Sequence, residues 1–345
     1  MFNANPRDFL IVSLTTIGPI GLDLQRRGFR VEALGLAGPL SMGATLFRLR
    51  RLLRGFAPDI VQTWMYHADL FGGLMARSLG LKVVWSIRNT VVPSEGLAQR
   101  LISKLCAHLS WWLPRAIVCV AKSTVPPYVR AGYDPAKMVV IGNGLEFETF
   151  DRALTREKQR SGNVANILCV GRFHRDKGQD ILLDAAVQLL SGRKDLSFVF
   201  AGRGCSWDNP TFRELVNRYG IGEHVVALGE RSDIPELLTD ATIFCLPSRT
   251  EGFPNGLAEA MAMNRACVAA DVGDAADLLG GTGILVPAQR PAELANALAR
   301  ALSMPAAELD AMGMASGRRV RAEFSIQTAR IRYLDLYQKI IEGMI

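Results

Sequence analysis

Short apolar runs rich in β-branched residues alternate with amphipathic helical stretches along this chain, and the alternation restarts once. The first series has strands expected at 9–14, 29–34, 60–64, 82–87, 116–120 and 138–141. The second has strands expected at 167–170, 196–201, 225–228, 242–246, 266–270 and 283–286. Such alternation predicts a parallel sheet with helices on both faces. The sequence therefore predicts an α/β protein with two tandem, Rossmann-like doubly wound sheets.

A charged, polar stretch from Glu146 to Asn166 separates the two series and has no continuous apolar face, so we interpret it as a linker. A chain of 345 residues is longer than one core usually serves, and two domains follow. We expect an N-terminal domain at 1–150, with a C-terminal helix at 328–345 packed back on it, and a second domain at 151–327. Ligands of open α/β sheets bind at the carboxyl ends of strands, so both domains can face one ligand.

Composition excludes several classes of protein. There is no apolar run of about 18 residues, as a membrane-spanning helix needs. The first residues, MFNANPRDFLIVSL, lack the pattern of a signal peptide. The six cysteines show no C-x-x-C spacing, so we expect buried, reduced thiols, no metal site and a cytoplasmic protein.

Charge is distributed unevenly. Residues 1–150 hold 17 Lys and Arg against 9 Asp and Glu, a net of +8, and the remainder holds 23 against 24, a net of −1. Solvated helix faces are one interpretation. The other is a basic surface that meets anionic lipid or a phosphorylated acceptor, on the inner face of a cell membrane. Nucleic acid is not expected, because no recognition motif accompanies the charge.

Trp111 and Trp112 end a helical pattern that starts at Gly96. Paired tryptophans can rest at a membrane interface. They are more often core residues, so we expect them to be buried.

The segment GRFHRDKG follows the first strand of the second series. Arg172 and Lys177 lie near the carboxyl end of that strand, before the next helix. Two cations there suit a diphosphate, because each charge-assisted hydrogen bond contributes roughly 1.5–3 kcal/mol. A plain solvated loop is the alternative. The segment is not a Walker loop.

The segment SRTEGFPNGLAEAMA, Ser248 to Ala262, opens a helix at a Pro-Asn-Gly turn. Asn255 is expected as the N-cap, and the N–H groups of Gly256, Leu257 and Ala258 can hold a phosphate. Glu259 suits the hydroxyls of a ribose, and Glu251 suits those of a sugar. Alternatively, both are carboxylates that complement the helix dipole.

Glycines follow two further strands of the second series, in Ala201-Gly202-Arg203-Gly204 and in Leu228-Gly229-Glu230-Arg231. Together with Gly171 they indicate a nucleotide cradle. The G-x-G-x-x-G fingerprint of a dinucleotide site is absent.

These segments, taken as a set, resemble the family-4 retaining glycosyltransferases of GT-B architecture. EGFPNGLAE, from Glu251 to Glu259, resembles that family's E-x7-E motif, and Val170-Gly171-Arg172 with Lys177-Gly178 resembles its V-G-R…K-G segment. Asp271 to Asp274 and Gly283 to Val286 resemble its next block. PDIVQTWMYHAD, from Pro58 to Asp69, resembles a subgroup of bacterial polysaccharide biosynthesis.

The resemblance implies transfer of a sugar, with retention, from a nucleotide-diphosphate sugar to a lipid-linked or oligosaccharide acceptor in surface polysaccharide synthesis. It implies that Arg172 and Lys177 neutralise the departing diphosphate in place of a metal ion, with no other cofactor. A UDP-sugar is the favoured co-substrate. Glu259 is implied to bind the ribose, Glu251 the donor sugar, and Gly229 with Arg231 to frame the base. The acceptor is implied to enter from the N-terminal domain.

The chain departs from the family pattern in two places. No G-G-x-E segment precedes Pro19, so the first strand–helix unit of the family is expected to be absent. Arg88 stands where many relatives have histidine. It is expected either to contact the donor or to close a salt bridge. His67 follows the strand at 60–64 and either faces the ligand or is structural.

Two other functions fit the same pattern. One is a truncated relative that binds nucleotide-sugar without turnover, and the other is a nucleotide-sugar epimerase of the same fold. Product analysis with donor alone separates the epimerase from a transferase.

Overall fold

The computed structural model describes residues 5–89, 96–155 and 164–345, and these form two compact units. Unit 1 comprises Met1–Cys119, Val125–Val139 and Asp335–Ile345. Unit 2 comprises Val120–Thr124 and Val140–Leu334. The chain therefore passes into unit 2 at Val140, before the expected boundary at 150, and its last segment joins unit 1 from Asp335.

Unit 1 is built on parallel strands, and β3 to β6 form a sheet in the order of the sequence. Strands β1 and β2 pair in parallel with each other as a second, two-stranded sheet. The strands are β1 (Leu10–Ser13), β2 (Arg30–Ala33), β3 (Ile60–Trp64), β4 (Lys82–Ile87), β5 (Ala116–Cys119) and β6 (Met138–Val140). The middle strands are buried on both faces, as parallel strands between helix layers are: Val84, Trp85 and Ile117 have no exposed surface.

The helices of unit 1 connect successive strands. They are α1 (Gly18–Arg26), α2 (Met42–Phe56), α3 (Gly73–Ser78), α4 (Leu97–Leu109) and α5 (Val125–Arg130). A π-helical turn, Ala68–Gly72, precedes α3. The turn begins after Met65, whose φ of 74° is left-handed. Such turns are local bulges in a helix and carry no distinct hydrophobic period.

Unit 2 holds a sheet in which β12, β11, β10, β7, β8 and β9 are neighbours in that order, all pairs parallel. The strands are β7 (Ala165–Val170), β8 (Leu196–Ala201), β9 (Val225–Gly229), β10 (Ile243–Leu246), β11 (Ala266–Ala270) and β12 (Ile284–Val286). From β7 the chain builds outward through β8 and β9, then returns to the other side of β7 with β10. The edge between β7 and β10 is thus a topological switch point, where ligands of open α/β sheets bind.

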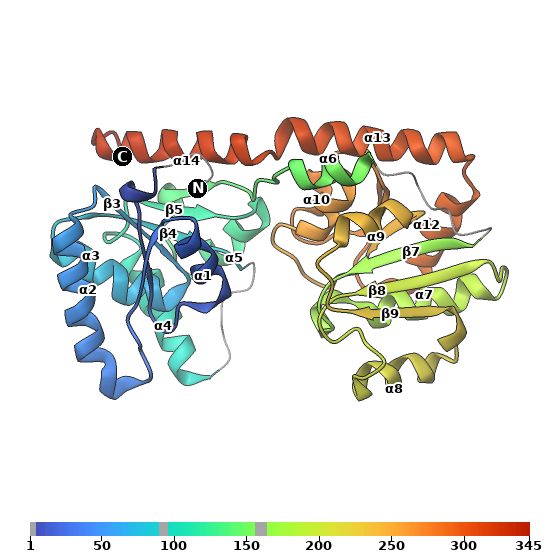
Figure 1. Cartoon of the computed structure of the whole chain (residues 1–345), viewed down its shortest axis with the longest axis horizontal. Coiled ribbons are helices and arrows are strands. Elements are labelled where there is room, and N and C mark those ends of the chain that lie inside the picture. Colours follow the sequence, from blue (N-terminus) through green and yellow to red (C-terminus); the bar gives the residue numbers. More distant parts are fainter. Residues whose placement is uncertain (1–4, 90–95, 156–163) are drawn as a thin grey trace. The chain divides into compact units, whose positions relative to one another are not determined.

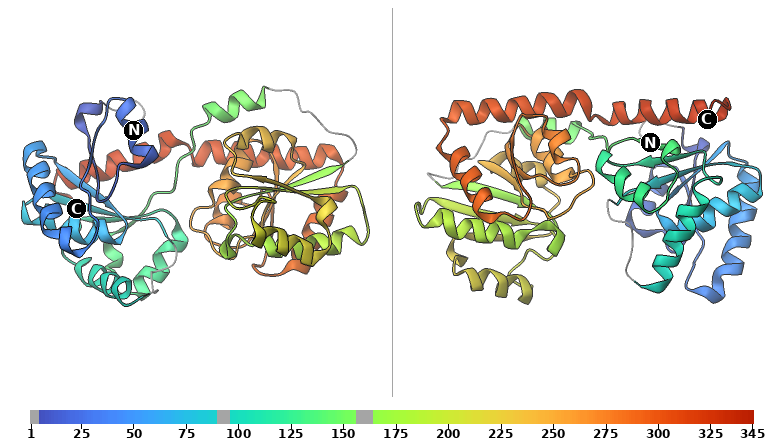
Figure 2. Two further views of the ribbon diagram at one scale, coloured as in Figure 1. Left: turned by 60° about the horizontal axis from the view of Figure 1, so that its bottom comes forward. Right: turned by 180° about the vertical axis from the view of Figure 1, so that it is seen from behind.

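Helices cover both faces of this sheet (Figure 1; Figure 2). Alternate strand residues divide between two cores: Ile167 and Cys169 of β7 face one core, and Leu168 faces the other. The first core contains α7 (Gln179–Leu190), α8 (Pro210–Tyr219) and α12 (Pro291–Ser303). The second contains α9 (Ile234–Asp240), α10 (Asn255–Ala262), α11 (Ala275–Leu279) and α13 (Ala306–Glu323). The helices after β7 and β10 therefore leave the switch point toward opposite faces.

One predicted element was wrong. The stretch expected to be a linker contains α6 (Glu148–Leu154), whose Ala153 is buried in the second core of unit 2. Residues 156–163 of that linker lie outside the described part. The last helix, α14 (Ile326–Ile341), ends the chain.

The six cysteines are buried and unpaired, as expected. Within the described residues, no helix is both long enough and apolar enough to cross a membrane.

Candidate functional site

The loop after β7 brings Lys177 back to the end of its own strand. Residues Arg175–Lys177 form a single 3₁₀ turn, and His174 Nδ1 accepts a hydrogen bond from the Asp176 N–H at 3.2 Å. The Lys177 side chain packs beside Gly171, where an added Cβ would meet it at 3.5 Å. Gly178, with a φ of 66°, then turns the chain into α7. Contact of the side-chain stem with Gly171, together with the tight turn, places the ammonium group at the end of β7.

The loop after β10 supplies the partner of that ammonium. Lys177 Nζ donates to both oxygens of Glu251, at 2.7 and 3.0 Å, and Ser248 Oγ donates to Glu251 Oε1 at 2.7 Å. The Glu251 side chain is only 8% exposed and that of Lys177 30%, so this is a largely buried ion pair. The sequence predicted separate roles for the two residues, on diphosphate and on sugar. The structure joins them directly.

Arg172 has a different environment from Lys177. It is exposed, and its guanidinium has no hydrogen-bond or ion-pair partner among the described residues. Its carbonyl oxygen accepts a 2.9 Å hydrogen bond from the buried Gln179 amide. The backbone at Arg172 is therefore fixed, while its guanidinium can meet an anion.

The N-terminus of α10 differs from the expected arrangement in two respects. Asn255 is the first helical residue, not the N-cap, which is Pro254; the Asn255 Oδ1 accepts instead from Asn143 Nδ2 at 2.9 Å. The N–H groups of Leu257 and Ala258 both donate to the Pro254 carbonyl, at 3.0 and 3.1 Å. Those two donors are therefore occupied, and Leu257 is fully buried. Asn255 and Gly256 are left as the anion-facing N–H groups of the first turn.

These groups line one cavity of about 280 Å³ at the switch point. Its walls are Val170, Gly171, Arg172, Lys177, Leu246, Glu251, Phe253, Pro254, Asn255, Gly256 and Glu259. Two cations and a helix N-terminus thus surround one space, which is the chemistry that a phosphate group requires. Two carboxylates on the same walls can accept hydrogen bonds from sugar hydroxyls.

Glu259 lies inside α10 and is partly exposed to the cavity. Burial raises the pKa of its carboxyl to about 7. A carboxylate placed there is stabilised by any hydroxyl that donates to it, so the residue suits a polyol such as a ribose.

The predicted glycines lie at the ends of three neighbouring strands. Gly171 follows β7, Gly202 follows β8 and Gly229 ends β9; the Gly202 N–H donates to Gly229 O at 2.6 Å. A Cβ added at Gly202 would lie 2.4 Å from the carbonyl carbon of Gly171, which is too close for two non-bonded atoms. Gly171 lines the cavity, whereas Gly202 and Gly229 allow the backbones beside it to approach closely. Arg231 donates to Asp233, at 2.7 Å from Nε, and lies outside the cavity walls.

Two predicted residues belong to unit 1. His67 is exposed, before the π-helical turn that follows β3, and Arg88 is half-buried after β4. Because β3 and β4 are paired neighbours, both residues lie at the carboxyl edge of the sheet of unit 1.

A clamp that the sequence did not reveal ties the two loops of the cavity together. Arg249 donates to both oxygens of Asp180, at 2.7 and 2.6 Å, and to the Arg175 carbonyl at 2.8 Å. The Arg249 N–H also donates to Asp176 O at 2.7 Å. Although burial opposes it, Arg249 keeps the pKa of Asp180 below its usual value. No local pattern signals a pair formed between residues so distant in the chain.

We expect Asp180→Asn to lower transfer by roughly tenfold, with a small change in melting temperature, because the clamp helps to hold together the two loops that carry Lys177 and Glu251. Arg193 and Asp195 form a matched control, since they make the same bidentate contact, at 2.7 and 2.5 Å, before β8 at the opposite end of the strands. Steady-state kinetics and thermal unfolding of Asp180→Asn and Asp195→Asn test this. Equal effects of the two substitutions on transfer would contradict it.

We expect Glu259→Gln to stabilise the ligand-free protein at alkaline pH. Since the pKa of Glu259 is raised to about 7, the folded state binds more protons than the unfolded state between about pH 4.5 and 7. The free energy of unfolding therefore falls as pH rises through that window. The variant should lack this fall and be more stable by about 1–3 kcal/mol at pH 8. Denaturation at several pH values measures it, with the exposed Glu214→Gln as control. Parallel profiles for wild type and Glu259→Gln would contradict it.

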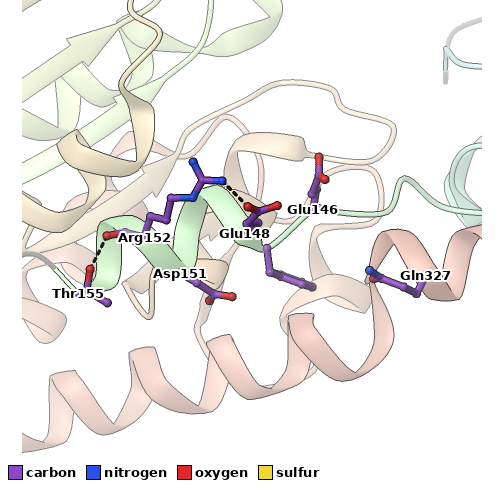
Figure 3. A pocket seen from close by; sticks show the side chains of 7 residues that line it. Glu146, Glu148, Asp151, Arg152, Thr155 and Gln327 are labelled. Atoms are coloured by element: carbon purple, nitrogen blue, oxygen red, sulfur yellow. Dashed lines mark hydrogen bonds and ion pairs between the residues drawn. The ribbon is translucent and has the colours of Figure 1, made fainter. Parts of the chain in front are cut away.

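A larger hollow, of about 560 Å³, lies beside α6 and the start of α14 (Figure 3). It is lined by the carboxylates of Glu146, Glu148 and Asp151; Arg152 pairs with Glu148. Arg321 pairs with Asp151 at 2.7 Å, so two of the three carboxylates are already matched by arginines, and the remaining excess of negative charge disfavours a diphosphate. The smaller cavity at the switch point is therefore the candidate site.

Two Rossmann-like α/β units with parallel sheets, of which the second has a cationic cavity at its switch point, define the GT-B class of fold. The structure is similar to that of HepE from Anabaena in complex with UDP, with a TM-score of 0.82 and 19% identity over 96% of this chain and 93% of that chain. Two family models match the chain: "Glycosyltransferase Family 4" over residues 9–149 and "Glycosyl transferases group 1" over residues 164–304. The chain belongs to the family-4 glycosyltransferases.

Curated relatives agree with this assignment. An α-D-kanosaminyltransferase from Streptomyces kanamyceticus is 28% identical over 330 residues, 89% of this chain and 84% of the relative. A D-inositol 3-phosphate glycosyltransferase from Catenulispora acidiphila is 31% identical over 83% of this chain and 73% of its own length. An Escherichia coli UDP-Gal:α-D-GlcNAc-diphosphoundecaprenol α-1,3-galactosyltransferase is 24% identical over 66% of this chain and 62% of its own.

Proposed function

We propose that this glycosyltransferase moves a sugar, with retention and without a metal ion, from a UDP-sugar to a lipid-linked or oligosaccharide acceptor of a surface polysaccharide. The observation that carries the proposal is the cavity in which Arg172, Lys177 and the first turn of α10 meet Glu251 and Glu259. The UDP bound to HepE and the UDP-galactose donor named for the E. coli relative support the choice of nucleotide. The diphosphoundecaprenol acceptor of that relative supports a lipid-linked acceptor.

The chain's own groups supply the transition-state chemistry. Negative charge develops on the diphosphate as the bond to the sugar breaks, and preorganised donors stabilise it most at that point. Arg172 offers its guanidinium, Lys177 its remaining ammonium proton, and Asn255 and Gly256 their N–H groups. Glu251 holds Lys177 in place while it accepts hydrogen bonds from the donor sugar. Glu259 accepts hydrogen bonds from the ribose, which favours its ionised form.

Thermal-shift measurements with UDP-, GDP- and ADP-sugars test the nucleotide, and NMR of the product reports its anomeric configuration. We expect stabilisation by a UDP-sugar, a retained configuration and transfer undiminished by EDTA. Stabilisation by GDP- or ADP-sugars alone would contradict the choice of UDP as the nucleotide. An inverted anomeric configuration in the product would contradict the proposed retention. A new sugar formed from donor alone would indicate an epimerase, and binding without turnover a non-catalytic relative.

A further inference from the structure

The turn between β11 and α11 lies against the loop after β10, which carries Glu251. The Asp274 N–H donates to Gly252 O at 3.0 Å. Gly273 has a φ of 58°, and a Cβ added there would lie 2.5 Å from both Glu251 O and Gly252 O, too close for non-bonded atoms. Only glycine therefore lets the two backbones approach so closely. The backbone at Glu251 is held by direct contact with this turn.

The Asp274 side chain binds a second segment of unit 2. Its Oδ2 accepts a hydrogen bond from the Lys122 N–H at 2.7 Å, and its Oδ1 accepts one from the Ser123 N–H at 2.8 Å. Asp274 is 8% exposed, so these bonds are largely shielded from water. Hydrogen bonds to a carboxylate are roughly twice as strong as those between neutral groups. Asp274 thus joins the turn firmly to this segment.

The second segment, Val120–Thr124, follows β5 in the chain but belongs to unit 2. Its first two residues are buried in the second core of unit 2, which also contains Phe253 from the loop after β10. The hydroxyls of Ser123 and Thr124 are buried, with no hydrogen-bond partner among the described residues. The Asp274 carboxylate therefore supplies a polar contact that these hydroxyls do not. The segment is a fixed point against which the loop can be held.

We propose that Asp274 is a positioning residue for the donor sugar, because it anchors the backbone beside Glu251 to the segment Val120–Thr124. The inference rests on the proposed function, in which Glu251 accepts hydrogen bonds from that sugar. Asp274 is not among the residues that line the cavity, so it acts through Glu251 and not by contact with the ligand. A displacement of about 1 Å in such a group can lower a rate roughly a hundredfold.

A residue that acts through Glu251 affects the two parts of the donor unequally. The sugar depends on the position of the Glu251 carboxylate. The diphosphate also meets Arg172 and the first turn of α10, which line the cavity independently of that carboxylate. Loss of the Asp274 anchor should therefore weaken a UDP-sugar more than it weakens UDP. A purely structural role would weaken both equally.

Hydrogen exchange tests the anchor without reference to the reaction. In Asp274→Asn, a side-chain NH2 replaces one of the two acceptor oxygens, so the amide at position 274 should exchange roughly tenfold faster, after correction for its intrinsic rate. Asp277→Asn is the matched control, because Asp277 Oδ1 bonds the same lysine, Lys122, at 2.7 Å, but through Nζ and between exposed side chains. Unchanged exchange at position 274 in Asp274→Asn, or equal acceleration in Asp277→Asn, would overturn the proposal.

Asp274→Glu provides a second comparison if Asp274→Asn does not fold. It keeps both acceptor oxygens on a longer stem, so its exchange at position 274 should lie between those of wild type and Asp274→Asn. Wild-type exchange in this variant, measured below its melting temperature, would also count against the anchor if Asp274→Asn is unfolded.

Calorimetry with UDP, UDP-glucose and UDP-galactose tests the consequence for the donor. We expect Asp274→Asn to weaken the tighter-binding UDP-sugar about tenfold and UDP about twofold, and Asp277→Asn to change neither. Glu251→Gln/Asp274→Asn should bind that UDP-sugar as weakly as Glu251→Gln does, since the two residues act as one unit. Equal losses for UDP and UDP-sugar, or additive losses in the double variant, would overturn the positioning role. Accelerated exchange in a protein whose wild type binds UDP-sugars no better than UDP would count against the proposed function, not against the anchor.

Discussion

Lys177→Ala is expected to lower kcat by about 10²–10³-fold, the loss typical when one preorganised donor to a developing anion is removed. The substitution also removes the cation beside the Glu251 carboxylate, which is 8% exposed and also accepts a hydrogen bond from Ser248. A buried carboxylate without its cation is destabilising, and it would repel a donor diphosphate. Steady-state kinetics with unfolding measurements separate loss of chemistry from loss of fold.

The ion pair allows a sharper test, because Lys177 has two candidate roles. If the ammonium acts on the diphosphate, Lys177→Ala/Glu251→Gln stays as inactive as Lys177→Ala. If it only neutralises Glu251, the double variant regains activity. We expect no regain, and an additional loss in Glu251→Gln alone, from disordering of Lys177. The exposed Lys194→Ala is the control for removing a lysine from unit 2. Wild-type activity in the double variant would remove Lys177 from the site.

Much of the fold could be predicted because the residues within a strand or helix, and those just before and after it, are enough to indicate it. The bounds of β3 and β4 match their predicted ranges, since these strands are apolar runs preceded by proline or glycine. Two local features were missed for physical reasons. The π-helical turn at Ala68–Gly72 adds a backbone irregularity without a sequence period, and α6 is a short helix held mainly by tertiary contacts.

The site, like the fold, has features that the sequence predicted and features that it did not. The sequence predicted that Arg172 and Lys177 would meet Glu251 and Glu259, because strand ends of a parallel sheet share an edge, and the structure places all four on one cavity. It did not predict the Lys177–Glu251 pair, the Arg249–Asp180 clamp or the occupied N–H groups of α10. These depend on rotamers and on the register of two loops far apart in sequence. Exposure of Trp111 and Trp112 was missed because composition does not tell which side of a helix end is covered.

Gly178→Ala is expected to destabilise unit 2 by about 3–5 kcal/mol, within the range of severe backbone and packing defects. Gly178 has a φ of 66°, where an L-residue is strained. Its added Cβ would also lie 2.8 Å from the carbonyl carbon of Pro247, inside van der Waals contact with that backbone. Gly220 has the same φ of 66° and open space around it, so Gly220→Ala carries the strain alone, about 1–2 kcal/mol. Denaturant unfolding of the two variants isolates the clash.

The contact between Gly178 and Pro247 affects the site as well as the stability of unit 2. Gly178 follows Lys177, and Pro247 follows β10 and precedes Ser248, so this close backbone contact sets the spacing of the two loops before any side chain pairs. Under conditions where both variants are folded, Gly178→Ala should therefore transfer sugar more slowly than Gly220→Ala. Equal unfolding free energies for the two alanine variants would show that the loops yield at Pro247. In that case Lys177 and Glu251 would owe their spacing to the Arg249–Asp180 clamp, and Asp180→Asn would become the more damaging substitution.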